Sequence, residues 1–192
     1  MTDAARPRGA GLRSTGSEPA STGVDPTVPD IAAWQAAADT GHARRGETLA
    51  GGGAARIATA LLDEVVTWCL AGRPNEACGL LAGPVLAGAG GSPTRFLPLA
   101  NAAASPYRYL IDPQEQLRAV LDIEDAGEEV WGIVHSHVAS PAVPSDTDVG
   151  LAGWPDALYL ICSLASEPPA IRAWSIRDGV VAEVDVSVAE AT

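Results

Sequence analysis

Two of the three histidines in the sequence, His135 and His137, are one residue apart and follow a run of apolar side chains. Successive side chains of a β-strand alternate between its two faces, so both imidazoles are expected to point the same way. Asp148 follows His137 by eleven residues. Two neutral imidazoles and one carboxylate suit Zn²⁺ and leave a fourth position for water, as in catalytic zinc sites. The spacing therefore predicts a three-ligand zinc site.

Ser145 has two possible roles beside this site. It begins a Ser-x-x-Asp pattern that ends at Asp148, and this pattern is typical of a helix cap. Its hydroxyl is equally suited to donate a hydrogen bond to an oxyanion next to the metal. The spacing alone does not decide between the two roles.

A water molecule that attacks a peptide bond also needs a base, and Glu76 is the candidate. It begins the apolar run EACGLLAG, at the edge of an expected buried strand. Carboxylates in such places are more often solvated turn residues, so the residue types alone leave this role open. The histidine pair has a plain alternative too, an exposed strand end with unrelated side chains. The serine and aspartate at this spacing make the metal interpretation far more specific.

Two helices are expected to position these residues. Apolar residues at three- and four-residue spacing, Trp68 among them, predict an amphipathic helix within 57–70. Asp112, followed by Pro113 and then Glu115, predicts a capping box that starts a second helix. The residues expected to face the core from this second helix are Leu117, Val120 and Leu121.

Apolar segments between turn residues predict the strands. They are expected at 78–82, 94–101, 107–112, 129–137 and 157–165, with two more inside 170–186. The last two are joined at Asp178-Gly179, a hairpin turn pair. The segment 129–137 is nearly all apolar, which favours a place in the middle of the sheet. The order of elements predicts an α/β domain with a mixed β-sheet flanked by helices.

Residues 1–55 differ in composition from everything after them. They are rich in Gly, Ala, Pro, Ser and Thr, and they end in GGGAA. Such a segment buries too little apolar surface to offset the entropy lost on ordering. We expect a flexible, low-complexity extension, with one short helix at 30–39 that Asp30 caps. The folded domain is expected to span 56–192.

Charge and composition exclude several classes of function. The formal net charge of −12 argues against a phosphate-backbone ligand, because such binding needs cationic side chains. No apolar run approaches the length of a membrane span, and the N-terminus does not resemble a secretory signal, so a cytoplasmic protein is expected. The three cysteines are far apart and form no disulfide framework. Cys69 and Cys162 are expected to be buried small hydrophobic residues, and the role of Cys78 is left open.

The five site residues together resemble the JAMM (MPN+) metalloprotease signature, which is an upstream Glu, His-x-His, seven residues and Ser-x-x-Asp. Stretches outside the signature are also similar to the short bacterial JAMM peptidases of the Mec type. These stretches are PNEACGLLAGP at 74–84, NAAASPYRYLIDPQEQL at 101–117, and the segment 135–165. The resemblance covers about residues 56–187 and implies a JAMM/MPN domain with a cytidine-deaminase-like fold.

The resemblance also implies roles for single residues. His135, His137 and Asp148 would bind Zn²⁺, and Glu76 would move a proton from the metal-bound water to the leaving amine. Ser145 would help to hold the tetrahedral oxyanion. Residues 138–143, VASPAV, are more apolar than expected for the bacterial relatives, which bears on the substrate and not on the metal set.

The implied substrate is the cysteine adduct of a small ubiquitin-like sulfur-carrier protein with a Gly-Gly C-terminus, and the implied product is free L-cysteine. One alternative is a JAMM peptidase that trims a ubiquitin-like carrier or removes it from other proteins. Another is a non-catalytic MPN scaffold, although such scaffolds usually lack the metal ligands.

Overall fold

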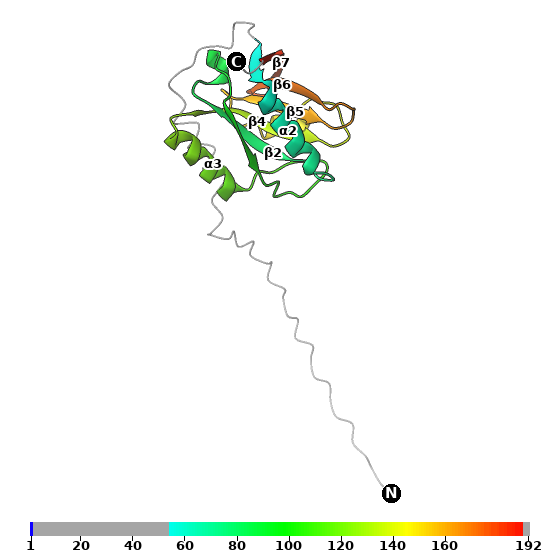
Figure 1. Ribbon diagram of the computed structural model, residues 1–192. Helices are drawn as coiled ribbons and strands as arrows, with labels where there is room; N and C mark the ends of the chain where they lie inside the picture. Colours follow the sequence, from blue (N-terminus) through cyan, green and yellow to red (C-terminus); the bar gives the residue numbers. More distant parts are fainter. Residues whose placement is uncertain (2–53, 190–192) are drawn as a thin grey trace.

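The computed structural model describes Met1 and residues 54–189, which form strands and helices around one mixed sheet (Figure 1). The strands are β1 (Ala55–Ala58), β2 (Cys78–Gly83), β3 (Arg95–Leu99), β4 (Glu129–His137), β5 (Leu158–Ser163), β6 (Ala170–Arg177), β7 (Val180–Val184) and β8 (Val186–Ala189). The helices are α2 (Thr59–Ala71), α3 (Pro113–Asp125) and α4 (Asp146–Gly150), with a 3₁₀ turn at Ala87–Ala89. The extension expected at 1–55 and its helix at 30–39 lie almost wholly outside the described residues.

The main sheet has six strands in the order β3-β2-β4-β5-β6-β7. The strands β4 and β5 run parallel, and the other neighbouring pairs are antiparallel, so the predicted mixed sheet is confirmed. The expected central position of the apolar segment 129–137 is also confirmed, since β4 lies between β2 and β5. The hairpin at Asp178-Gly179 joins β6 to β7, and both turn residues have positive φ, as such a turn requires.

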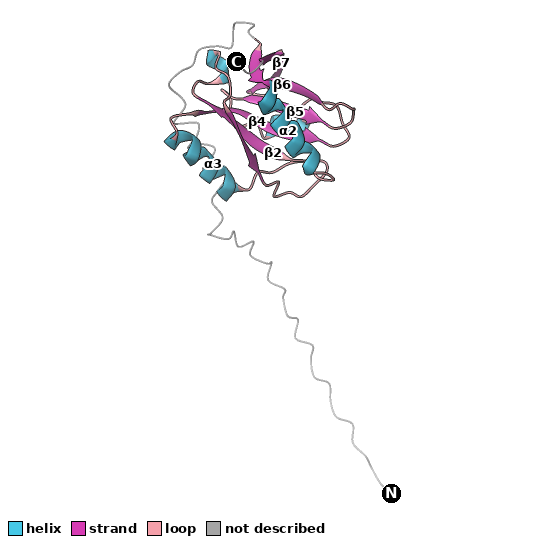
Figure 2. Cartoon of the chain, in the orientation of Figure 1, coloured by secondary structure: helices cyan, strands magenta, loops and turns pink. Residues whose placement is uncertain are grey.

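The helices α2 and α3 cover opposite faces of this sheet (Figure 2). On one face, α2 buries three side chains: Leu61, Val65 and Cys69. On the other face, α3 buries Ala119, Val120 and Ile123. The expectation that Leu117 and Leu121 face the core is therefore wrong, and they are 39% and 49% exposed. Trp68, also expected inside, is partly exposed, and its indole N–H donates to the Cys78 carbonyl.

Two helix starts differ from the predictions in detail. Residues 55–58 form β1, which pairs in parallel with β8, so α2 begins only at Thr59. Asp112 caps α3 as predicted, by accepting hydrogen bonds from the first turn. The reciprocal half of the capping box is wrong, because the Glu115 carboxylate accepts a hydrogen bond from the backbone N–H of Ala100 instead.

The strand predicted at 107–112 is wrong. Residues 101–111 form a loop that a single β-bridge between Asn101 and Ile111 closes. The Asn101 side chain bonds the backbone of this loop at residues 103, 108 and 110, which uses the groups that a neighbouring strand would need. The loop lies next to the start of β2, where its Ser105 carbonyl accepts a hydrogen bond from the N–H of Glu76.

Among the described residues, no helix has both the length and the apolar character to cross a membrane.

Candidate metal centre

The two histidines lie at the end of β4, on one face of the strand, as predicted. Ile133, two residues before His135, packs with the side chains of α3, so the imidazoles are on the α3 side of the sheet. Ser136 points to the other side, where its hydroxyl accepts a hydrogen bond from the N–H of Ala77 at 2.8 Å. Both imidazoles are buried, because β2 and β5 flank the strand along its length.

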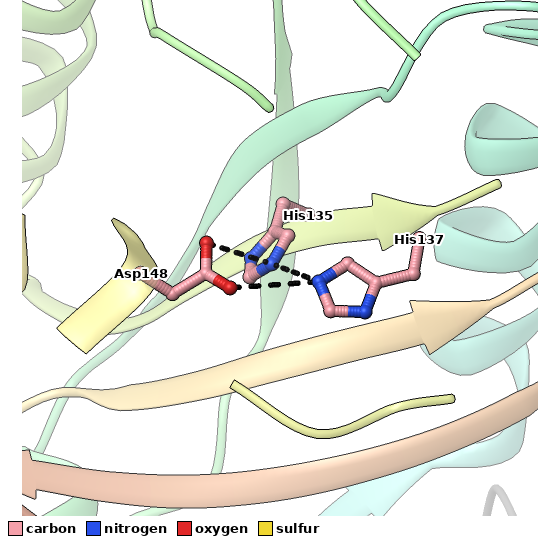
Figure 3. Close-up of side chains that lie close together, drawn as sticks. All are labelled: His135, His137 and Asp148. Atoms are coloured by element: carbon pink, nitrogen blue, oxygen red, sulfur yellow. Dashed lines mark hydrogen bonds and ion pairs between the residues drawn. The ribbon is translucent and has the colours of Figure 1, made fainter. Parts of the chain in front are cut away.

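Asp148 reaches the same point from the short helix α4 (Figure 3). Its two carboxylate oxygens lie 3.4 Å from His135 Nε2 and 3.5 Å from His137 Nε2, and the two Nε2 atoms are 3.2 Å apart. Two ligands of a tetrahedral ion with bonds of 2.0–2.1 Å are about 3.3 Å apart. The donor atoms of all three residues lie within 4.8 Å of one another, so the side chains fit a single metal ion.

The charges at this centre also favour a cation. Burial raises the cost of ionising Asp148, but the two nearby imidazoles and the hydrogen bond from Ser145 outweigh it, and the pKa of Asp148 is lowered. Burial lowers the pKa of His135, which favours its neutral form. Burial also acts against protonation of His137, but Asp148, Pro141 and Glu76 outweigh it, and its pKa is raised. A buried carboxylate beside a neutral imidazole is the chemistry of a metal ligand set.

Ser145 is the N-cap of α4, and the predicted capping box is confirmed. Its backbone N–H and its hydroxyl both donate to Asp148 Oδ2, each at 2.7 Å, and its Oγ accepts from the N–H of Asp148. The serine therefore starts the helix and fixes the Asp148 carboxylate at the same time. The oxyanion role of Ser145 stays a prediction.

Ser145→Ala is expected to lower the free energy of unfolding by about 1 kcal/mol, because a helix loses its N-cap. It should also weaken metal binding by about tenfold, since a group that orients a ligand is lost. Thermal unfolding and a chelator competition would measure the two effects, with Ser145→Thr as the control that keeps the hydroxyl. Unchanged metal affinity in Ser145→Ala would show that the hydroxyl does not orient Asp148.

Glu76 lies directly before β2, and it is only 5% exposed. Its backbone is held on both sides, by the Ser105 carbonyl and by the Asn101 side-chain amide, which donates to the Glu76 carbonyl at 2.8 Å. Burial raises the pKa of Glu76 to about 7, while His137 opposes this rise and Asp148 adds to it. Glu76 thus places a carboxyl group next to the histidine–aspartate cluster. With a pKa of about 7, this group can gain or lose its proton near neutral pH.

All three cysteines are buried and form no disulfide, so the expectation for Cys69 and Cys162 is confirmed. Cys78, left open in the sequence, pairs in register with His135 across β2 and β4. Burial raises the pKa of the Cys78 thiol to about 12. Cys78 is therefore a thiol at neutral pH, and it donates a weak hydrogen bond to the Leu99 carbonyl.

Two residues of the 101–111 loop also lie at the centre and were not singled out in the sequence. The Tyr109 ring stacks on the His135 imidazole, and Asn101 holds both the loop and Glu76. Apolar and polar residues alternate around Tyr109 as in a strand, so the sequence did not indicate that this segment is a loop. The signal that could have found it is the run of Asn, Ser and Pro at 101–106, which favours a loop.

Comparisons with known proteins agree with this geometry. Residues 58–177 match the family described as prokaryotic homologs of the JAB domain. The CysO-cysteine peptidase of Mycobacterium tuberculosis is 41% identical over 131 residues, which are 68% of this chain and 88% of that protein. A desampylase of Haloferax volcanii is 44% identical over 91 residues, 47% of this chain and 63% of the desampylase. A solution structure from Desulfitobacterium hafniense, 35% identical, aligns over 71% of this chain and 93% of its own with a TM-score of 0.64.

Proposed function

Since this chain belongs to the family of prokaryotic homologs of the JAB domain and is a hydrolase, we propose that it releases cysteine from a small ubiquitin-like carrier protein. The bond to be cleaved joins the C-terminal residue of the carrier, expected to be the second Gly of a Gly-Gly pair, to the amine of L-cysteine. The observation that carries this proposal is the buried cluster of three metal donors beside a carboxyl group with a pKa of about 7. The likeness to a CysO-cysteine peptidase supports the choice of substrate.

We propose Zn²⁺ as the metal, held by His135, His137 and Asp148. When bound, it would lower the pKa of a water molecule toward about 7 and polarise the carbonyl of the bond to be cleaved. Two imidazoles and a carboxylate are a common ligand set for this ion. The His137 Nδ1–H donates to the Pro141 carbonyl at 2.7 Å, since a carbonyl only accepts, and this leaves Nε2 free to bind the metal.

Glu76 is the proposed general base and acid. Its carboxylate accepts a proton from the attacking water and then gives that proton to the amine of the leaving cysteine. A pKa of about 7 suits both steps near neutral pH, because the group gains and loses the proton with similar ease. The backbone contacts of Glu76 fix residue 76 at the start of β2. From there its carboxyl interacts electrostatically with His137 and Asp148.

For Ser145 we propose a second role in addition to its cap. Its hydroxyl can turn from Asp148 Oδ2 toward the oxyanion that develops on the cleaved carbonyl. Its backbone N–H would continue to hold the same carboxylate oxygen during this turn. The metal ligand therefore stays oriented while the hydroxyl is used.

The similarity to a desampylase supports a second candidate, removal of a ubiquitin-like carrier from other proteins. The match to residues 58–177 supports our proposal that 56–192 form the catalytic domain, and we propose a cytoplasmic location.

The test compares two substrates with the full chain loaded with zinc. One is a Gly-Gly carrier with cysteine at its C-terminus, and the other is the same carrier joined to a lysine side chain. We expect free cysteine from the first substrate at a rate that the second does not match. Cleavage of the lysine conjugate alone would establish the second candidate. No product from either substrate, with zinc bound and the carrier intact, would reject both.

A further inference from the structure

The two histidine ligands differ in what holds their rings. His137 uses its second ring nitrogen, Nδ1, to donate to the Pro141 carbonyl. His135 Nδ1 is buried, and it has no hydrogen-bond partner among residues 54–189. Metal-binding histidines almost always donate their second ring N–H to an acceptor, which fixes the orientation of the ring. Some other contact must therefore orient His135.

That contact is the ring of Tyr109. Its centroid lies 4.4 Å from that of the His135 imidazole, and the two planes are inclined by only 20°. Rotation of the imidazole out of its plane, about its bond to Cβ, would tilt the two rings apart and lose this contact. Stacked aromatic pairs contribute roughly 0.5–1.5 kcal/mol beyond the area that they bury. The stack therefore holds the plane of the His135 imidazole in which Nε2 can face His137 and Asp148.

Tyr109 is itself held by Asn101. The Asn101 Oδ1 accepts a hydrogen bond from the N–H of Leu110 at 3.0 Å, and its Nδ2 donates to the carbonyl of Arg108 at 3.2 Å. These two backbone groups immediately follow and precede Tyr109 in the chain. The same Nδ2 also donates to the Glu76 carbonyl at 2.8 Å. The Asn101 amide thus fixes the backbone on both sides of Tyr109. It also links the 101–111 loop to the backbone of Glu76, the proposed base.

We propose that Tyr109 is a positioning residue that orients the His135 imidazole for metal binding by stacking, with Asn101 as the residue that holds Tyr109 in place. The inference rests on the proposed metal site, but it does not depend on which bond the enzyme cleaves. The ring of Tyr109, and not its hydroxyl, is the part that acts. A planar aromatic replacement should therefore preserve the effect, and an aliphatic replacement should not.

The experiment measures the zinc affinity of the full chain by competition with a chromophoric chelator, and it also records the absorption spectrum of the Co²⁺ form. Tyr109→Phe should bind zinc within about threefold of the wild type. Tyr109→Leu should bind about 10- to 100-fold more weakly, the usual range for loss of a group that orients a ligand. Its Co²⁺ spectrum should change as well, because the ligand field depends on the orientation of His135.

Tyr107 provides a matched control two residues away in the same loop. It is 88% exposed, so Tyr107→Leu removes an aromatic ring from the loop without touching His135, and its zinc affinity should equal that of the wild type. Should Tyr109→Leu fail to fold, Tyr109→Met replaces it, because this flexible side chain fills an apolar space without a ring. Wild-type affinity in the folded aliphatic variant overturns the proposal, and so does a Tyr109→Phe variant as weak as the aliphatic one.

Asn101→Ala tests the second part of the proposal. It should weaken zinc binding, and its loss should be less than additive with that of Tyr109→Leu, since both changes remove the same stack. Additive losses would show that Asn101 does not act through Tyr109. A wild-type chain that binds zinc but releases no cysteine rejects the proposed substrate and leaves these affinity measurements fully interpretable.

Discussion

Glu76→Gln is expected to lower the rate of carrier–cysteine hydrolysis by about 10²–10⁴-fold, the usual contribution of a general acid–base group. Glutamine has nearly the same shape as glutamate, but it cannot take a proton from the attacking water. Zinc should remain bound, because Glu76 is not among the three clustered donors. Release of free cysteine and the metal content of the same sample would measure the two outcomes together.

Glu76→Gln should leave the position of residue 76 unchanged. The contacts that place Glu76, to the Ser105 carbonyl and from the Asn101 amide, both use the backbone of residue 76, and glutamine keeps them. Glu64 is the matched control, an exposed glutamate on α2, which packs on the other face of the sheet. Glu64→Gln should retain full activity. Near-normal activity in Glu76→Gln would assign the proton transfer to another group.

The centre of the domain could be predicted because its signals are local. The strand β4 is nearly all apolar because β2 and β5 cover its two edges and the helices α2 and α3 cover its two faces. A strand also necessarily places residues at i and i+2 on one side. The cap at Ser145 depends on four consecutive residues, so the Ser-x-x-Asp pattern was enough to place Asp148 at the first turn of α4. Neither feature requires knowledge of distant contacts.

The features that could not be predicted depend on contacts between distant segments. The alternation at 107–112 resembles a strand, but Asn101 takes the hydrogen-bonding groups of that segment and makes it a loop. The strand β1 exists only because β8, about 130 residues later, pairs with it. The position of Tyr109 over His135 follows from the loop and not from the pattern of its neighbours.

In the helix α3, too, the sequence did not predict all the side chains that face the core. Leu117 and Leu121 are strongly apolar, and hydrophobicity alone places them inside. The helix instead turns Ala119, Val120 and Ile123 toward the sheet, and these three side chains join the core around β4.

His137→Ala should abolish activity and also weaken zinc binding by more than about 100-fold, a larger loss than removal of an orienting group produces. The substitution removes one of the three donors that cluster among residues 54–189, and it leaves the Asp148 carboxylate buried with a single imidazole. The metal content after dialysis, measured beside that of Glu76→Gln, separates a ligand from a base. Retention of stoichiometric zinc would show that His137 is not a ligand.

Ser163→Ala is the control for a disturbance of the 138–143 segment, which follows His137 in the chain. Ser163 is buried, it pairs in register with His137 across β4 and β5, and its hydroxyl donates to the Ser140 carbonyl. Its loss would disturb the 138–143 segment, including the Pro141 carbonyl that holds His137, without removing a metal donor. We therefore expect Ser163→Ala to keep zinc with a modest loss of affinity. A loss as large as that of His137→Ala would mean that the shape of this segment, and not the imidazole, determines metal binding.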